Sequence, residues 1–589
     1  MPLDRRETRD WLRPGGPPCL RPDPTPHYTT PHHNGFFIIN QMNFSTALKL
    51  NDVDDYITPS LECIKPVKIP SSVGKTKSIV IGKDGSYVAT NSSGEKYVLP
   101  KAKIDLNDCL ACSGCITTAE TILVSQHSVE AFLNLLKNPD PGREIVVSLS
   151  PQSLASLAAS LNVGKPSTLS ESFVASGLSP DGLDGVRNFC VRLLRTHGVT
   201  HVLDTTWSRD LSLSASAEEF VQAFSGNSSA PHMPVLTGIC PGWVCYAEKT
   251  HFKGLPGSEN RVQAGTDEEG SHLIQHLSKI RSPQQLLAGL LKQLTSSVSC
   301  SKSPFLVFVM PCYDKKLEAS RNEFTLPDGV EKEADLVLGT NEFISVLELL
   351  LQEPSLPTVE TSSETASHCQ RVLCMLSSRL TPDAPLPDRM YRHAGSGSGG
   401  YAFHTLRFAA DKLFQITLPV SVTDDPRVLT RKLGNQDMQE ILLFSSAEDC
   451  TAAKAGLSGR TPYRHAATNP APLLAFLVAN GFRNIQTVVQ QLKRAYTKAN
   501  LSRSSVRAEV PFDYIEIMAC PNGCLNGGAQ AKVDLAYVTQ AYFSLEERDV
   551  LTSDPARCLL KLTDSDSKIH TTYRVVPKIE ITSPSSLKW

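Results

Sequence analysis

The chain has 589 residues, of which 41% are hydrophobic and 20% are charged, and its 58 basic side chains nearly balance 60 acidic ones. This length exceeds what one hydrophobic core usually serves, so two or three domains are expected. The net charge of -2 gives no strong positive field, which argues against nucleic acid or an anionic membrane as a partner. Every apolar stretch is far shorter than the ~20 residues of a membrane helix, so no membrane partner is expected.

The first part of the chain divides into two segments. Residues 1–42 are rich in Pro, Arg and His without a helical or strand period, so we expect a disordered extension, with Met42 as the functional start. The arginines near the beginning precede Pro and Gly instead of an apolar segment, so no secretory signal is expected. Residues 43–140 are interpreted as a small cysteine-bearing domain, with short strands at residues 78–81 and 97–99.

Residues 141–535 show an α/β pattern. Buried strands are expected at residues 144–149, 200–204, 234–237, 305–310, 334–338 and 514–518. Helical patterns alternate with these runs, which predicts mainly parallel sheets. Polar, Pro- or Ser-rich insertions are expected to be surface loops at residues 254–272, 352–392 and 446–470. Residues 536–589 are expected to form a smaller C-terminal segment.

Two helices of this region carry clear signals. The first is expected to have Ser282 as its side-chain cap and Pro283 at its first position. Its apolar face is formed by Leu286, Leu287, Leu290, Leu291 and Leu294. The second helix has an apolar side formed by Ile485, Val488, Val489 and Leu492. Both stripes have helical spacing and are interpreted as core.

Three cysteines with two-residue spacers form the first candidate metal group: Cys109, Cys112 and Cys115. Such spacing lets three thiolates converge from one tight loop, which is typical of iron–sulfur ligation. A ferredoxin-type run would place its fourth cysteine where Ala119 stands, so the fourth ligand must come from elsewhere. Cys63 is the natural candidate. A zinc site is the alternative, although zinc sites more often pair two separated knuckles.

Four further cysteines form the second candidate group: Cys240, Cys312, Cys520 and Cys524. The first three each follow an expected strand, and α/β folds place their sites at the carboxyl ends of parallel strands. Four soft, anionic thiolates suit a cuboidal iron–sulfur cluster. Separate buried core cysteines are the alternative, but they leave the small residues around the sulfurs unexplained. These residues are Pro241, Gly242, Pro311, Pro521, Gly523, Gly527 and Gly528.

The other cysteines lack metal-ligand spacing and are interpreted as free thiols in a reducing cytosol. They are Cys19, Cys190, Cys245, Cys300, Cys369, Cys374, Cys450 and Cys558. Lys315 and Glu318 are spaced to form an ion pair near Cys312. The spacing alone fits a pair inside the site and an ordinary surface pair equally well.

Three segments around the second group resemble the signature motifs of the iron-only hydrogenase family, at residues 237–243, 310–318 and 516–530. The resemblance implies that family's fold, with two α/β lobes around a buried cluster site, in addition to the small N-terminal domain. It implies that the four cysteines of the second group ligate a cubane. It also implies that Cys312 and Cys524 flank the place of a di-iron subcluster, with Cys524 as the bridging thiolate.

Other segments are similar to the non-hydrogenase branch of this family, the cytosolic iron–sulfur assembly factors. They lie at residues 48–57, 63–66, 108–115, 246–251 and 395–401. This likeness implies that Cys63, Cys109, Cys112 and Cys115 hold an N-terminal cluster, so that the chain carries two 4Fe-4S clusters. It further implies a cytosolic protein, with the nucleus as a second location, that links the early scaffold proteins to the late targeting complex.

The first hydrogenase motif carries two adjacent cysteines, the first of which relays protons, and Ile239 takes its place here. An isoleucine cannot transfer a proton, so the resemblance implies cluster handling and no enzymatic hydrogen turnover. Docking on the WD-repeat and HEAT-repeat subunits of the targeting complex is expected partly through Trp589, although Lys588 departs from the small or acidic residue usual there. The alternatives are a redox enzyme of the hydrogenase type and a zinc-stabilised protein of the nuclear prelamin A-binding branch.

Overall fold

The computed structural model describes residues 76–81, 87–91, 96–99, 126–164, 166–177, 183–250, 273–298, 302–326, 331–353, 390–455, 461–466, 470–502, 506–550 and 569–574. A three-stranded antiparallel sheet comes first along the chain. Its strands are β1 (Thr76–Ile81), β2 (Tyr87–Asn91) and β3 (Lys96–Leu99). The strands predicted at residues 78–81 and 97–99 are therefore confirmed, whereas β2 was not predicted.

A four-stranded parallel sheet has the order β5-β4-β7-β8. Its strands are β4 (Ile145–Leu149), β5 (His201–Asp204), β7 (Phe305–Met310) and β8 (Leu336–Gly339). Successive side chains of a strand point to opposite faces, and both faces of this sheet are buried. Val147 belongs to the core on one face and Val146 to the core on the other. All four strands confirm the sequence prediction.

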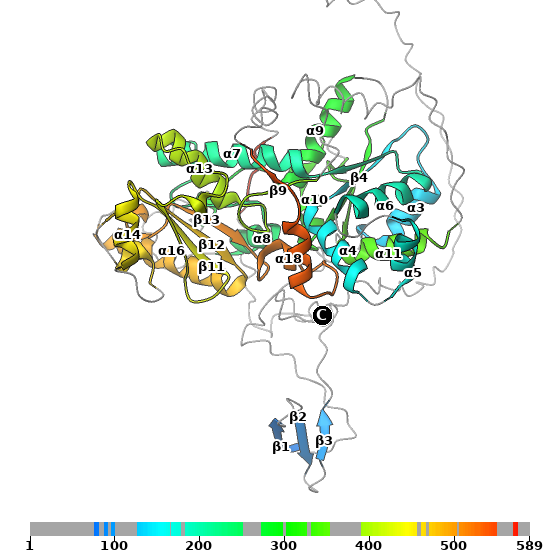
Figure 1. The fold of residues 1–589 in the computed structure, drawn as a ribbon, viewed down its shortest axis with the longest axis horizontal. Helices are drawn as coiled ribbons and strands as arrows, with labels where there is room; N and C mark the ends of the chain where they lie inside the picture. The colour runs from blue at the N-terminus through cyan, green and yellow to red at the C-terminus, as the bar shows by residue number, and fades with distance from the viewer. Residues whose placement is uncertain are drawn as a thin grey trace, which may run out of the picture. The chain divides into compact units, whose positions relative to one another are not determined.

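Helices cover both faces of this sheet (Figure 1) and supply most of the other residues of its two cores. The core around Val147 includes α3 (Val129–Lys137), α4 (Pro151–Val163), α5 (Thr168–Ala175), α6 (Leu183–Thr196) and α11 (Thr340–Leu350). The core around Val146 includes α7 (Thr206–Phe224), α9 (Pro283–Val298) and α10 (Asp314–Ala319). Because helices cover both faces of the parallel sheet, a binding site is expected at the carboxyl ends of the strands, as in other α/β folds.

A five-stranded mixed sheet has the order β10-β11-β12-β13-β6. Its strands are β6 (Val235–Leu236), β10 (Val428–Lys432), β11 (Met438–Leu443), β12 (Leu474–Asn480) and β13 (Tyr514–Met518). Figure 1 shows β11, β12 and β13 side by side, as their pairing requires. Leu477 faces a core shared with α8 (Pro241–Lys249) and α16 (Phe482–Ser502), whereas Phe476 faces α13 (Tyr401–Phe414).

Shorter elements complete the described part of the chain. They are η4 (Ile274–His276), η5 (Asn322–Phe324), η6 (Val422–Asp424), α14 (Ala447–Ala455), α15 (Tyr463–Ala466), α17 (Val506–Glu509), η7 (Gly523–Asn526) and α18 (Leu535–Phe543). A two-stranded parallel sheet joins β9 (Arg392–His393) to β14 (Glu547–Arg548). In none of the described segments is a helix long and apolar enough to cross a membrane.

The mainly parallel pairing expected for the α/β region is confirmed, but β10, β11 and β12 were not predicted. The first two strands run antiparallel to their neighbours. Glu440 of β11 is completely buried and accepts a hydrogen bond from Arg431 Nε of β10 at 2.6 Å. This buried charge pair interrupts the apolar pattern by which a strand is recognised in a sequence.

The loop predicted at residues 446–470 is wrong, because α14 and α15 lie within it. The buried residues of α14 are Cys450 and Ala453, so its sequence has hardly any apolar stripe. The insertion predicted at residues 254–272 lies outside the described residues, as does nearly all of the one at 352–392.

The helix predicted after Ser282 is α9, and it begins at Pro283 as expected. Its leucine face is buried at Leu286, Leu287, Leu290 and Leu291. The side-chain cap is wrong: the Ser282 carbonyl accepts a hydrogen bond from Leu286 N at 2.9 Å, but the Ser282 hydroxyl has no partner and lines a pocket. The apolar side predicted for the second helix is confirmed in α16, where all four residues are buried.

Candidate metal centre

Four cysteines from three strand ends line one cavity. Cys240 follows β6 at the first turn of α8, Cys312 follows β7, and Cys520 follows β13. Cys524 lies in η7, just after Cys520. All four line a cavity of about 70 Å³, whereas one water molecule needs roughly 10–15 Å³. The structure thus brings together the four members of the second predicted group.

Burial dominates the chemistry of these thiols. Burial raises the pKa of Cys240 to about 12 and that of Cys312 well above its usual value. The other cysteines of the cavity raise both values further, because charges of the same sign repel each other. The thiols are therefore neutral at physiological pH without a metal. Any metal group that binds them has to displace their protons.

Within the ranges that the structure describes, no group of three or more His, Cys, Asp or Glu side chains is placed to hold one metal ion. The four thiols instead surround a space larger than an ion. Ala519 N already donates a hydrogen bond to Cys240 Sγ at 3.3 Å, and such outer hydrogen bonds orient a ligand and tune the metal group it holds.

The glycine-rich segment at residues 395–401 holds Cys524 in place. Ser398 Oγ accepts a hydrogen bond from Cys524 N at 3.0 Å. Gln152 Nε2 of α4 donates to a backbone carbonyl of the same segment at 3.0 Å. Gln530 Nε2 donates to the carbonyls of both Gln152, at 3.1 Å, and Cys524, at 3.3 Å. These bonds connect η7 to the helix that follows β4, so the position of Cys524 depends on both sheets.

Gly523→Ala should destabilise the fold more than a comparable glycine substitution elsewhere. Gly523 has φ +76°, and a Cβ there would lie 2.3 Å from Ser398 Oγ. Gly142 has φ +78° with open space around it, so Gly142→Ala measures the cost of the left-handed backbone alone, about 1–2 kcal/mol. Denaturant unfolding of the metal-free proteins should show an additional loss of ~1 kcal/mol or more for Gly523→Ala. Equal losses for the two variants would contradict this.

Ile239 and Lys315 complete one wall of the cavity. Ile239 is 7% exposed and offers no titratable group to the cavity. Its carbonyl accepts a hydrogen bond from Lys315 Nζ at 3.2 Å, and Lys315 Nζ also pairs with Glu318 Oε2 at 2.8 Å. The side chains of this pair are 10% and 8% exposed. The predicted ion pair is therefore present, and it is a buried part of the site.

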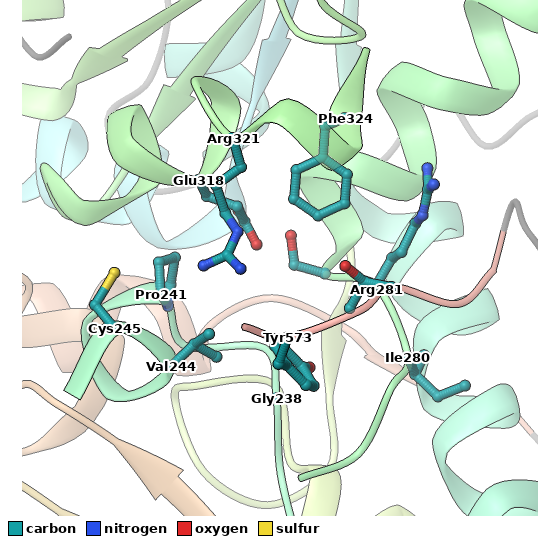
Figure 2. Close-up of a pocket in the computed structure, with 12 residues that line it drawn as sticks. Gly238, Pro241, Val244, Cys245, Ile280, Arg281, Glu318, Arg321, Phe324 and Tyr573 are labelled. Atoms are coloured by element: carbon teal, nitrogen blue, oxygen red, sulfur yellow. The ribbon is translucent and has the colours of Figure 1, made fainter. Parts of the chain in front are cut away.

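A second pocket adjoins the cysteine cavity and shares Pro241 with it. Figure 2 shows Tyr573 beside Gly238 on one side of this pocket and Cys245 beyond Pro241 on another. A Cβ at Gly238 would lie 2.1 Å from the Tyr573 hydroxyl, so only glycine allows this contact. The Tyr573 hydroxyl donates to the carbonyl of Ser278 at 2.5 Å.

Tyr573 belongs to the C-terminal segment at residues 569–574, which pairs with the chain beside β6. Thr571 N donates to the carbonyl of Lys279 at 2.7 Å, and Arg281 N donates to the carbonyl of Ile569 at 2.8 Å. Leu277, next to these residues, bridges Leu236 of β6. The C-terminal segment thus continues the edge of the five-stranded sheet near the loop that carries Cys240.

The remaining predicted site residues cannot be placed. Cys63, Cys109, Cys112 and Cys115 of the first group, and Trp589 of the tail, all lie outside the described residues. Their roles stay predictions.

Polar residues that the sequence analysis did not identify also line the cysteine cavity. Ser150 and Thr205 follow β4 and β5, so the rule that located the cysteines at strand ends also applied to them. Gln152, Arg209 and Tyr401 come from helices and carried no such signal.

Comparisons with known proteins agree with this geometry. The family described as iron only hydrogenase large subunit, C-terminal domain, matches residues 143–257 and 266–528. The cytosolic Fe-S cluster assembly factor narfl of Xenopus tropicalis is 36% identical over 571 residues, covering 93% of this chain and 99% of that protein. Cytosolic iron-sulfur assembly component 3 of Mus musculus is 38% identical over 498 residues, covering 83% and 85%.

Among solved structures, a variant of an apo FeFe-hydrogenase from Chlamydomonas reinhardtii aligns with a TM-score of 0.48 and 21% identity, covering 76% of this chain and 98% of that one. The family match includes all four cavity cysteines, and the two curated relatives align over most of their length. The chain therefore belongs to the iron-only hydrogenase-like family and, within it, to the branch of cytosolic iron–sulfur assembly component 3.

Proposed function

We propose that this protein is a component of cytosolic iron–sulfur protein assembly that holds two 4Fe-4S clusters. One cluster is assigned to Cys240, Cys312, Cys520 and Cys524. The other is assigned to Cys63, Cys109, Cys112 and Cys115. Curated relatives at 36% and 38% identity are named as cytosolic iron–sulfur assembly proteins, which supports this class of function.

The observation that carries the proposal is the meeting of four thiols, delivered by three strand ends, around one shared space. Zinc would need its thiolates about 2.3 Å from one point, and the described residues offer no such arrangement. A cubane cluster spreads its four ligands over four separate irons. The set of four thiol donors around one cavity therefore suits a cluster.

The residues around the thiols support cluster holding over hydrogen turnover. A bound cluster would supply one-electron chemistry and a group that other proteins can accept. Ile239 lines the cavity, and its alkyl side chain neither takes up nor releases a proton. Ser398 and Gln530 fix the backbone at Cys524, which keeps that ligand in position.

Partner docking is the second part of the proposal. We assign the link to the WD-repeat and HEAT-repeat subunits of the targeting complex partly to Trp589, because a terminal aromatic side chain can anchor in an apolar pocket. Early scaffold proteins are assigned as the source of the clusters. The location follows from these partners: the cytosol, with the nucleus as a second compartment.

An oxygen-free iron and sulfide count tests the proposal. Two clusters correspond to about eight irons and eight sulfides per chain, and Cys520→Ala and Cys109→Ala should each lose about half of both. Cys190→Ala is the matched control, because Cys190 is a buried free thiol of the α6 core. Zinc without iron and sulfide, or a full iron count in Cys520→Ala, would refute the proposal. Hydrogen evolution from reduced viologen would favour the redox enzyme instead.

A further inference from the structure

Arg209 of α7 is a buried cation that lacks a carboxylate partner, and it lines the cysteine cavity. The residue is 5% exposed. Its Nη2 donates to Gln152 Oε1 at 2.9 Å, whereas its Nη1 is buried without any partner. Among the residues that the structure describes, no carboxylate oxygen lies within 4.0 Å of the guanidinium. Proteins normally pair a buried charge, since an isolated one costs several kcal/mol.

No carboxylate of the described residues forms an ion pair with Arg209, although its charge and that of the buried Asp204 attract each other over a longer distance. Lys315, the second cation of the lining, already has Glu318 as its partner at 2.8 Å. The hydroxyl of Tyr542 lies beside Arg209 and interacts with it weakly. Burial raises the pKa of Tyr542 more than Arg209 lowers it, so this hydroxyl is uncharged and cannot serve as a counter-ion. In the metal-free protein Arg209 is therefore a buried cation without a direct ion-pair partner, and only the more distant Asp204 offsets its charge.

Arg209 is also close to one of the predicted ligands. Burial raises the pKa of Cys524, while a hydrogen bond with Ser398 and the charges of Lys315 and Arg209 lower it. Gly399 packs beside the arginine, since a Cβ at this position would lie 3.4 Å from Arg209 Cδ, an ordinary van der Waals distance. Arg209 thus lines the cysteine cavity next to the glycine-rich segment that also contacts Cys524.

We propose that Arg209 is the counter-charge for the anionic cluster that the four thiolates bind. The inference rests on the proposed function. Four thiolates outweigh the positive charge of a four-iron core, so the complete group is an anion, and a cation beside it favours both its retention and its reduction. In this role Arg209 is a positioning and tuning residue, because its charge acts on the cluster and it replaces none of the ligands.

Arg209→Gln distinguishes a counter-charge from a structural residue, because it should raise the stability of the metal-free protein and weaken the binding of the cluster. In the metal-free protein the substitution removes an unpaired buried charge, so the midpoint of denaturant unfolding should rise. In the cluster-loaded protein the same substitution should speed cluster loss to an iron chelator about tenfold and shift the reduction potential to a more negative value. Arg209→Lys keeps the charge, so the loaded Lys variant should retain a potential near that of the original protein.

Arg281→Gln is the matched control. Arg281 is also a buried arginine, at 6% exposed, but its Nη1 pairs with both carboxylate oxygens of Glu333 at 3.0 Å. Its substitution should lower the unfolding midpoint of the metal-free protein, since it removes the buried cation that both carboxylate oxygens of Glu333 bind.

Two results would overturn the proposal: a fall in metal-free stability for Arg209→Gln as large as that for Arg281→Gln, or an unchanged potential in the loaded variant. If Arg209→Gln did not fold, Arg209→Lys would decide, because a potential shifted strongly downward despite the retained charge would contradict the assigned role. A protein that bound no cluster at Cys520 in any variant would instead refute the proposed function. The metal-free measurement would still report on the unpaired charge, so the two failures are distinguishable.

Discussion

Lys316→Met should lower the free energy of unfolding by about 3–5 kcal/mol, because it leaves a carboxylate buried without its cation. Lys316 lies in α10, four residues after Cys312, and its side chain is 1% exposed. Its Nζ pairs with Glu342 Oε1 at 2.7 Å and donates to the carbonyl of His127, also at 2.7 Å. The side chain of Glu342 is 2% exposed, so water cannot replace the lost partner. Denaturant unfolding of the metal-free protein measures the effect.

Two controls accompany this prediction. The double variant Lys316→Met with Glu342→Gln has a neutral amide in place of the buried carboxylate. The amide oxygen can still accept the hydrogen bond from Gly339 N, so much of the lost stability should return. Lys137→Met removes a cation from an exposed pair with Glu353, whose side chains are 56% and 47% exposed, and should change stability by less than ~1 kcal/mol. A loss in Lys316→Met no larger than that of Lys137→Met would show that burial is unimportant here.

Acid should destabilise the fold between pH 6.5 and about 4 through His127. Burial, followed by the positive charge of Lys316, lowers the pKa of His127 from 6.5 to about 4. His127 Nδ1 accepts a hydrogen bond from Val337 N at 3.1 Å, an arrangement that a protonated ring cannot make. Because the unfolded chain binds the proton more readily, this stability is present above pH 6.5 and is lost as the pH falls towards 4.

The size of the effect follows from the same values. Between pH 7 and 5 the lost stability should be about 2 kcal/mol. His127→Gln cannot titrate, so its unfolding free energy should fall less over this interval than that of the original protein. His232→Gln, which replaces an exposed histidine, is the control for removing any imidazole. Parallel pH profiles for the original protein and His127→Gln would rule out this source of acid sensitivity.

The sequence predicted the strands that carry the candidate centre better than the strands at its periphery. Cys240, Cys312 and Cys520 follow apolar runs that are buried on both faces, and such runs are recognisable without any partner strand. By contrast, β11 contains Glu440, whose burial makes sense only beside Arg431 of the neighbouring strand. A residue whose environment is created by tertiary pairing gives a misleading local signal.

The dependence on tertiary contacts also explains why the sequence analysis did not identify Arg209 as part of the cysteine cavity. Arg209 lies on a helix whose buried residues include many polar ones, so nothing in its spacing marks it as part of a site. Its importance follows from the buried position of its guanidinium without an ion-pair partner, and a sequence does not show which side chains remain unpaired after folding. The Ser282 cap failed for a related reason, because this residue lines a pocket to which the distant Thr571 and Tyr573 also contribute.

The close contact of Tyr573 with Gly238 limits how far the end of the chain can lie from the loop that carries Cys240. Fifteen residues follow Arg574 up to the terminal Trp589, and a fully extended chain advances at most about 3.3–3.6 Å per residue. If a partner binds Trp589 as proposed, it stays within roughly 50 Å of the loop that carries Cys240 while Tyr573 keeps its position. An acceptor protein held by such a partner would be confined to a small volume around the thiols. Its effective concentration there would depend on the length of the chain between Arg574 and Trp589.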